Sequence, residues 1–110
     1  MQVLLGALAI GIKSFIGSTY NFTAPIANRI IDAYEKGDIQ TARAETLRLK
    51  KVMDCAEKHG DQVSTFKALT CMAGIPLGPT RKPLRALDVN EAKFFQNKLK
   101  QIGYFDWINE

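Results

Sequence analysis

The sequence is poor in the side chains that most often build metal centres or activate nucleophiles. Its 110 residues include one histidine, His59, and two cysteines, Cys55 and Cys71. The cysteines lie sixteen positions apart with no CxxC pair, so neither a zinc site nor a disulfide framework is expected. We therefore predict two free thiols, buried or half-buried, in a reducing compartment, and neither a metal nor a cofactor.

The sequence also lacks a long apolar run and a concentrated patch of one charge. Residues 1–12 are almost wholly apolar, but they are too few to span a bilayer and have no basic start or small-residue cleavage site. The net charge is +4, yet Lys and Arg are interleaved with acidic residues and no aromatic stripe accompanies them. This composition favours a cytoplasmic protein that binds neither membrane nor nucleic acid.

What the sequence does contain is helical periodicity, interrupted by glycines, prolines and capping residues. The pattern predicts helices over residues 3–10, 25–36, 38–59, 63–73 and 88–102, each followed by a glycine. Pro25 suits the first turn of its helix, and Asp38 and Asp88 suit N-caps. Residues 75–87 hold three of the four prolines and are expected to form an extended connector, while residues 104–107 make an aromatic tail.

Only residues 14–18, Ser-Phe-Ile-Gly-Ser, have the pattern of a buried β-strand. A single strand cannot pair with itself, and its backbone donors and acceptors would be unsatisfied if it were buried alone. The strand therefore needs neighbours that these 110 residues do not contain. The preceding helix is apolar on most sides, which predicts burial on more than one side.

Two motifs give this pattern a family likeness. Residues 17–21 read Gly-Ser-Thr-Tyr-Asn directly after the predicted strand, and residues 78–84 read Gly-Pro-Thr-Arg-Lys-Pro-Leu in the connector. Together with Leu-Leu-Gly-Ala-Leu-Ala at 4–9, they resemble the N-acetylneuraminate lyase family over essentially the whole chain. The related dihydrodipicolinate synthases usually end this strand differently, so we rank them second.

The resemblance implies the α/β class, and within it the C-terminal part of a TIM (β/α)8 barrel with a three-helix extension. Helix 7, strand 8 and helix 8 of the barrel would occupy residues 1–36 and the extension residues 37–110, so this part is mostly helical. The implied activity is that of a class I aldolase, which cleaves N-acetylneuraminate to N-acetylmannosamine and pyruvate through a lysine Schiff base. Members of the family usually form homotetramers, and their substrate is a small sugar acid.

The catalytic groups of that family would lie outside this chain. The Schiff-base lysine, the proton-transferring tyrosine and the carboxylate-binding turn belong to earlier strands, so the resemblance implies no catalytic residue here. Lys13 opens the predicted strand, whereas barrel active sites lie at the C-terminal ends of strands. Lys67 follows Val63 at helical spacing, and its stem is expected to cover apolar surface.

Substrate binding is expected from four residues at the end of the strand. In the family the position of Ser18 contacts the hydroxyl tail of the sugar, although a hydrogen bond to the adjacent loop is the alternative. Gly17 would let the backbone approach a ligand closely. Thr19 is a weaker candidate, and Tyr20 either contacts substrate or packs and positions its neighbours.

Two functions stay open on the sequence alone. The chain is either part of a lyase whose other residues complete the barrel, or a non-catalytic helical module that binds another protein, such as a full-length relative. A barrel lysine and a Gly-x-Asp-Glu motif encoded upstream would favour the first. A genuine start at Met1 would favour the second.

Overall fold

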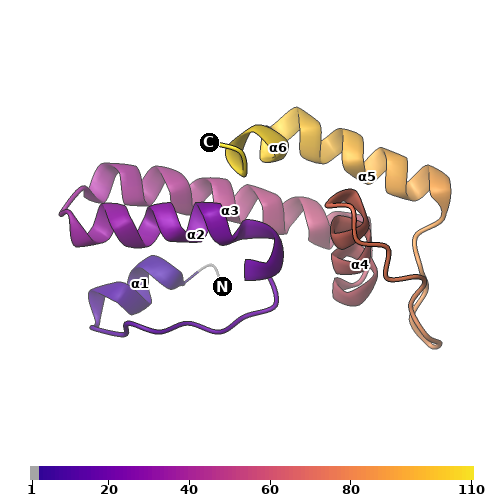
Figure 1. Cartoon of the computed structure of the whole chain (residues 1–110), viewed down its shortest axis with the longest axis horizontal. Helices are drawn as coiled ribbons and strands as arrows, with labels where there is room; N and C mark the ends of the chain where they lie inside the picture. The colour runs from indigo at the N-terminus through magenta and orange to yellow at the C-terminus, as the bar shows by residue number, and fades with distance from the viewer. Residues whose placement is uncertain (1–2) are drawn as a thin grey trace. The chain divides into compact units, whose positions relative to one another are not determined.

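A computed structural model describes residues 3–110 of the chain, which form helices joined by irregular segments, with no β-strand among the described residues (Figure 1). Residues 1 and 2 of the predicted apolar run lie outside the described residues. The helices, in chain order, are α1 (Leu4–Ala9), α2 (Tyr20–Glu35), α3 (Ile39–His59), α4 (Gln62–Met72), α5 (Val89–Ile102) and α6 (Tyr104–Trp107).

The chain divides into two compact units, and the division falls inside α3. One unit holds the residues up to Lys51 together with Phe105–Glu110, and the other is Val52–Tyr104. The barrel and extension segments predicted at 1–36 and 37–110 describe a family fold rather than these units, so that boundary stays a prediction.

The predicted helix over residues 3–10 is confirmed as α1, which lies against α2 (Figure 1). It ends before Gly11, whose φ of 92° is left-handed and suits glycine. Leu4 and Leu8 are buried. Val3 and Ile10, which flank the helix at its N- and C-terminal ends, are 71% and 79% exposed. Within the described residues α1 therefore buries one face rather than the two or more that its composition predicts.

The predicted strand over residues 14–18 is wrong for this chain taken by itself. Residues 12–17 have no regular secondary structure, and residues 18 and 19 form a turn into α2. No backbone–backbone hydrogen bond joins residues 13–16 to another described residue. The physical reason is the absence of a second strand, because a strand is defined by its ladder of bonds to a neighbour.

Helix α2 begins at Tyr20, not at Pro25 as predicted, and Pro25 lies inside it. The amides of residues 20–23 already bond the carbonyls of residues 17–19, so the helix starts before the proline. Pro25 has no amide to donate to the carbonyl of residue 21, four positions earlier. The buried face of α2 includes Ile26 and Ile30, each fully buried, and that of α3 includes Ala42 and Leu49.

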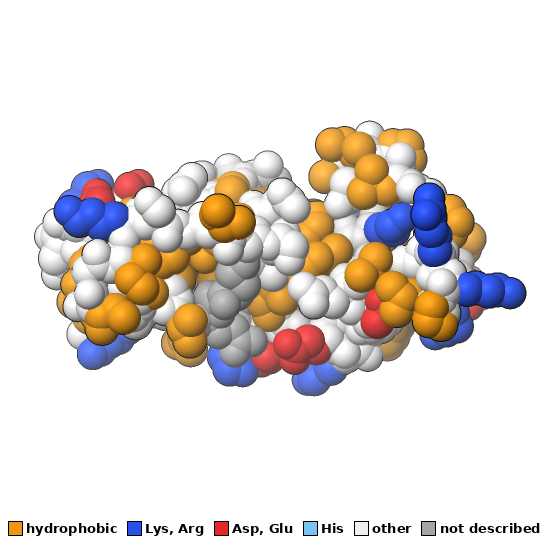
Figure 2. Space-filling view, turned by 90° about the horizontal axis from the view of Figure 1, so that it is seen from below, with side chains coloured by type: hydrophobic (Ala, Val, Ile, Leu, Met, Phe, Trp, Pro, Cys, Tyr) orange, Lys and Arg blue, Asp and Glu red, His pale blue; other side chains and the backbone are white. Residues whose placement is uncertain are grey.

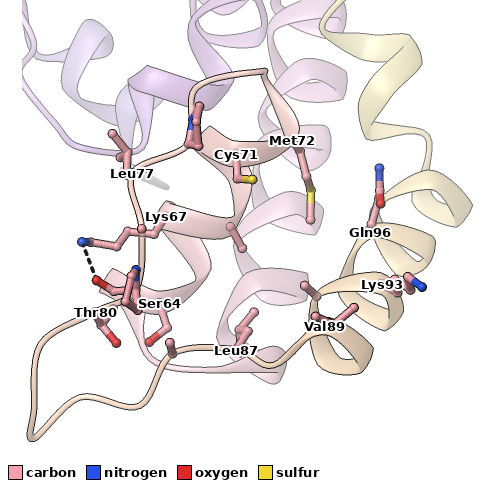
Figure 3. A pocket seen from close by; sticks show the side chains of 16 residues that line it. Ser64, Lys67, Cys71, Met72, Leu77, Thr80, Leu87, Val89, Lys93 and Gln96 are labelled. Atoms are coloured by element: carbon pink, nitrogen blue, oxygen red, sulfur yellow. Dashed lines mark hydrogen bonds between the residues drawn. The ribbon is translucent and has the colours of Figure 1, made fainter.

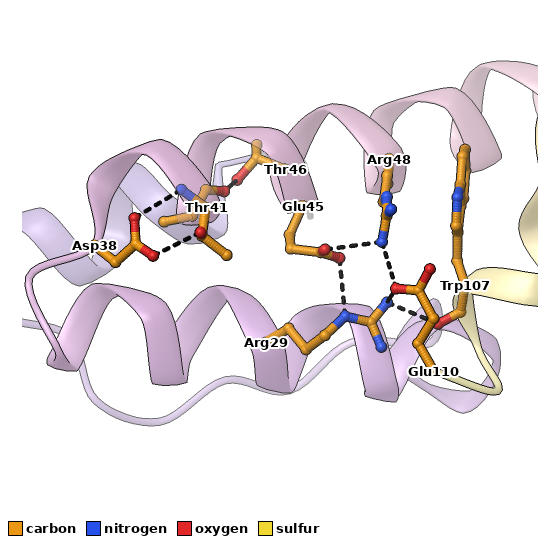
Figure 4. A network of polar contacts seen from close by, with 9 residues as sticks. Arg29, Asp38, Thr41, Glu45, Thr46, Arg48, Trp107 and Glu110 are labelled. Atoms are coloured by element: carbon orange, nitrogen blue, oxygen red, sulfur yellow. Dashed lines mark hydrogen bonds and ion pairs between the residues drawn. The ribbon is translucent and has the colours of Figure 1, made fainter.

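A buried carboxylate joins α2, α3 and the C-terminal residues of the same unit (Figure 4). Glu45 is 6% exposed and accepts from Arg29 Nε at 3.0 Å and from Arg48 Nη1 at 2.9 Å. Arg29 Nη2 also donates to the Trp107 carbonyl at 2.7 Å, and Arg48 Nη1 to Glu110 Oε2 at 2.6 Å. Both guanidinium groups thus donate to Glu45 of α3 and also to the C-terminal residues, Arg29 to Trp107 and Arg48 to Glu110.

The second unit has its own core and capped helices. Phe95 and Leu99 of α5 are fully buried, and Val52 is 1% exposed. Asp61 and Asp88 cap α4 and α5 by accepting the amides of Ser64 and Glu91, at 2.9 Å and 2.8 Å. The predicted cap at Asp88 and the predicted connector are therefore confirmed, whereas the cap at Asp61 was not predicted. The predicted cap at Asp38, in the first unit, is also confirmed, because Asp38 Oδ1 accepts the Thr41 amide at 3.0 Å. The aromatic tail at 104–107 forms the short helix α6, which the sequence did not predict.

Candidate functional site

The predicted substrate residues lie together in the turn that leads into α2. The Tyr20 amide bonds the Gly17 carbonyl at 3.2 Å, and the Asn21 amide bonds the Ser18 carbonyl at 3.3 Å. Ser18 is exposed and Gly17 is half-buried. The turn therefore leaves Ser18 exposed to solvent, as a contact to a sugar hydroxyl would require.

Gly17 is not among the glycines with positive φ. Its backbone conformation is therefore open to other residues, and glycine is not needed there for the turn itself. The remaining reason for glycine is the lack of a side chain, which would let a ligand approach the backbone. That role stays a prediction.

Thr19 differs from Ser18, its neighbour in the same turn. It is 2% exposed, and its Oγ1 has no hydrogen-bond partner among residues 3–110. Its carbonyl is heavily used, accepting the amides of Phe22 and Thr23 at 3.1 Å each and the Thr23 hydroxyl at 2.8 Å. Thr19 is thus fixed in the backbone of the turn and turned away from solvent.

Tyr20 is half-buried at the first position of α2. Burial raises the pKa of its phenol above the ordinary value of 10.0, so the hydroxyl keeps its proton at neutral pH. It could donate a hydrogen bond to a substrate or to another part of the protein. The structure of the chain leaves both roles open.

These four residues can bind a polyol, but they hold no amine, thiol or carboxylate for covalent or acid–base chemistry. Lys13, the lysine nearest in sequence, is exposed in the irregular segment before the turn. Lys67 donates from Nζ to the Pro79 carbonyl at 3.1 Å, so it ties α4 to the connector. Neither lysine is buried as a Schiff-base lysine would be.

A cavity of about 710 Å³ lies within the second unit, between α4, the connector and α5 (Figure 3). Its walls are mostly apolar, with Met72 and Leu77 among them, and Lys67 and Lys93 are the cationic residues that line it. This cavity was not predicted from the sequence. Its only sequence signal is the proline-rich connector, which cannot pack as a helix over α4.

The two thiols differ in exposure. Both are free, as predicted, but Cys71 is exposed where the sequence predicted at least partial burial, because it lies on the cavity side of α4 rather than in the core. Cys55 is buried, and burial raises the pKa of its thiol against the opposing effect of Lys58 and Lys98. Cys71 is therefore the thiol open to reagents.

Among residues 3–110, no group of three or more His, Cys, Asp or Glu side chains is arranged to hold a metal ion. Nor does any described helix combine the length and apolarity needed to cross a membrane.

Comparison with known proteins places the chain in a family. The model of the dihydrodipicolinate synthetase family matches residues 2–102, a span that includes the turn at 17–20. The rat N-acetylneuraminate lyase is 32% identical over 107 residues, which cover 96% of this chain and 33% of the relative. The names of the curated relatives confirm the ranking of lyases above synthases made from the sequence.

Solved structures give the same result. The N-acetylneuraminate lyase of Aliivibrio salmonicida superposes with a TM-score of 0.86 at 31% identity, covering 94% of this chain and 34% of that one. The Proteus mirabilis N-acetylneuraminate lyase gives 0.85 at 27% identity, covering 94% and 35%. The chain thus spans about a third of the length of the proteins it matches.

These structural relatives are TIM-barrel lyases, and the predicted fold class, the C-terminal helical part of such a barrel protein, is confirmed. The absence of a strand in the described residues fits a segment that contains too little of the barrel to form its sheet. From the family match over residues 2–102, the chain belongs to the dihydrodipicolinate synthetase family.

Proposed function

We propose that this chain is part of an N-acetylneuraminate lyase, a class I aldolase that reversibly cleaves N-acetylneuraminate to N-acetylmannosamine and pyruvate. The observation that carries the proposal is the similarity to solved N-acetylneuraminate lyases over 94% of the chain. The complete protein would be cytoplasmic and homo-oligomeric, with a small sugar acid as its substrate.

The chemistry requires an amine that the chain does not offer. A lysine condenses with the keto group of the substrate, water leaves, and the protonated imine accepts the electrons of the carbon–carbon bond as it breaks. The proton of the hydroxyl on the departing carbon of that bond passes to a base, the sugar aldehyde leaves, and an enamine remains on the lysine. The proton held by the base returns to the terminal carbon of the enamine and regenerates the imine, whose hydrolysis releases pyruvate and the free lysine amine. We place the lysine and the base outside these 110 residues.

The chain's own contribution is to bind the sugar. The exposed Ser18 hydroxyl would hydrogen-bond the hydroxyl tail, with Gly17 allowing close approach and the Tyr20 phenol available as a donor. A hydrogen bond of this kind contributes about 0.5–1.5 kcal/mol. Ser18 thus affects sugar affinity and leaves the imine chemistry to other residues.

A non-catalytic module that binds another protein is the alternative. It is favoured by one observation: each unit has a buried core of its own, Ile26 and Ile30 in the first and Phe95 and Leu99 in the second. A helical segment with such cores could persist without a barrel. The two functions differ in whether the chain can complete an active lyase.

The decisive experiment joins this chain to the rest of the Aliivibrio salmonicida lyase, in place of the segment that it matches. The hybrid should cleave N-acetylneuraminate and form a borohydride-trapped pyruvate adduct, seen by intact mass. The 110-residue chain alone should do neither. An inactive but folded hybrid, or a stoichiometric adduct on the chain alone, would contradict the proposal.

In the same hybrid, Ser18→Ala should raise KM for N-acetylneuraminate about twofold to tenfold and leave the pyruvate adduct unchanged. Ser14→Ala is the matched control, because Ser14 is also exposed but precedes the turn. Equal KM values for the two variants would show that Ser18 does not contact the sugar and only bonds the adjacent loop.

A further inference from the structure

The charges around the cavity of the second unit set the class of molecule that it can bind. Among the described residues that line it, two are lysines and none is acidic. Lys67 of α4 and Lys93 of α5 lie on opposite sides of it (Figure 3). Its volume of about 710 Å³ is within the range of small-molecule pockets, which is roughly 300–1,000 Å³. The cavity therefore favours an anion and disfavours a cation.

The apolar part of the wall requires an apolar body as well as an anionic group. Met72, Leu77 and Leu87 contribute apolar surface from α4 and from the two ends of the connector. Leu77 is 53% exposed, so part of this surface is open to solvent. Covering it with an alkyl tail is favourable in proportion to the area removed from water. The methionine side chain, with three rotatable bonds, can adapt to the shape of such a tail.

The polar groups of the wall leave one cation open to a ligand. Ser64 Oγ donates to the Arg85 carbonyl at 2.6 Å and Lys67 Nζ to the Pro79 carbonyl at 3.1 Å, so both hold the connector to α4. Lys93 is exposed and makes no hydrogen bond or ion pair with residues 3–110. Its ammonium group is therefore free to pair with an anionic head group, and Lys67 adds positive charge on the other side.

We propose that this cavity binds an alkyl carboxylate, a molecule with an apolar alkyl tail and one carboxylate group, such as a fatty acid. The tail would lie along Met72, Leu77 and Leu87, and the carboxylate would pair with Lys93. The proposal concerns the second unit alone and does not depend on lyase activity. An apolar segment of the remaining lyase could fill the same space, but it would leave the charge of Lys93 without a partner.

The test titrates decanoate into the 110-residue chain and follows the alkylation of Cys71 by N-ethylmaleimide. Cys71 is exposed and lines the cavity, whereas Cys55 is buried, so bound decanoate should slow the modification of Cys71 alone. Decyltrimethylammonium has the same tail with a positive head group, and it should protect Cys71 about tenfold less well. Decanol, which has no charge, should fall between the two. All three are used below their micelle concentrations.

Variants of the wall separate the charge from the apolar surface, each being compared with and without decanoate. Lys93→Gln should weaken protection by decanoate about twofold to fivefold, the effect of one solvated ion pair, and leave protection by decanol unchanged. Lys100→Gln is the matched control, because Lys100 is also exposed on α5 but does not line the cavity. Leu77→Asp places a negative charge in the apolar wall and should weaken protection by decanoate about tenfold or more.

Equal protection by decanoate and decyltrimethylammonium would show binding without selection for an anion, and would overturn the proposal. Equal effects of Lys93→Gln and Lys100→Gln, or no protection of Cys71 at all, would also overturn it. In the hybrid with the Aliivibrio salmonicida lyase, decanoate should protect Cys71 as it does in the chain. Protection in the chain but not in the folded hybrid would mean that a segment of the lyase fills the cavity, which contradicts the proposed ligand.

Discussion

Two irregular segments of this chain, residues 12–17 and the connector over residues 75–87, differ in how their polar groups are satisfied. The connector is tied to the helices of its own unit. Its Arg85 carbonyl accepts from the Ser64 hydroxyl at 2.6 Å, and its Pro79 carbonyl from Lys67 Nζ at 3.1 Å. Residues 13–16 have no backbone–backbone hydrogen bond to any residue that the structure describes.

The composition of the two segments explains the difference. The connector contains three prolines, which have no amide to satisfy, and it lies beside polar side chains of α4. Residues 12–17 are Ile-Lys-Ser-Phe-Ile-Gly, a run suited to a sheet, and Ile16 is fully exposed. Hydrophobic side chains also lie open on the face in Figure 2. Residues 12–17 thus have the composition of a strand that needs a partner, whereas the connector is held by side chains of α4 within its own unit.

The largest expected effect follows from this contrast. Expressed alone, the chain should self-associate, because an unpaired apolar edge is a template for pairing with another copy. Ile16→Lys should shift sedimentation toward the monomer by placing a charge on that edge. Ile75→Lys is the matched control: Ile75 is 58% exposed at the start of the connector, and its substitution should have little effect. If the unmodified chain sediments as a monomer, or if both variants shift its sedimentation equally, residues 12–17 do not differ from the connector in driving self-association.

The second prediction concerns the hydrogen bond from the Ser64 hydroxyl that holds the connector to α4. Ser64 Oγ lies 2.6 Å from Asp61 Oδ2 as well as from the Arg85 carbonyl, and Ser64 is 3% exposed. In an Ile16→Lys background, Ser64→Ala should lower the free energy of unfolding by about 1–2 kcal/mol, since buried polar groups lose their partner.

Urea unfolding of that variant measures the loss. Thr80→Ala serves as the control, because its hydroxyl makes only a 3.4 Å contact to the Leu84 carbonyl. Its effect should stay within about 0.5 kcal/mol. If Ser64→Ala were as mild as Thr80→Ala, the connector would not depend on its tie to α4.

Local chemistry made the helices predictable from the sequence. Glycine after each apolar stripe and Asp38 and Asp88 at N-caps fix helix ends through bonds within a few residues. The start of α2 was misplaced because the turn at residues 17–19 already supplies carbonyls to its first amides, which outweighs the signal of Pro25.

What sequence reasoning missed depends on tertiary contacts. The motif at 17–21 identified the candidate site, but it gave no sign that Ser18 is exposed while Thr19 is buried without a partner. The strand pattern at 14–18 is a property of residues that need a neighbour, so it does not determine the structure of the chain by itself. The cavity beside the connector likewise arises from packing between segments distant in sequence.

The smallest expected effect is a pH dependence of the helices that have an aspartate N-cap. In the first unit, hydrogen bonds from the Thr41 side chain and amide lower the pKa of Asp38. Hydrogen bonds from the Ser64 side chain and amide lower the pKa of Asp61, and the bond from the Glu91 amide lowers that of Asp88. Since both folded pKa values lie below the unfolded value near 3.8, the stabilisation is present above about pH 4 and is lost as pH falls through the folded values. Helix α1 has no side-chain cap and no acidic residue in its first turn, so it gains nothing from such a titration.

NMR titration of the carboxyl carbons should therefore give Asp61 and Asp88 pKa values below 3.8, and the helical signal of α4 and α5 should weaken in acid. Asp61→Asn with Asp88→Asn should flatten this response at little loss near neutral pH, because asparagine caps about as well as aspartate but does not ionise. Glu91→Gln is the matched control, since the Glu91 carboxylate accepts from Arg85 Nη1 at 2.6 Å and that ion pair lies beside the Asp88 cap. An acid response that persists in the double Asn variant and disappears in Glu91→Gln would assign the effect to that ion pair instead of the caps.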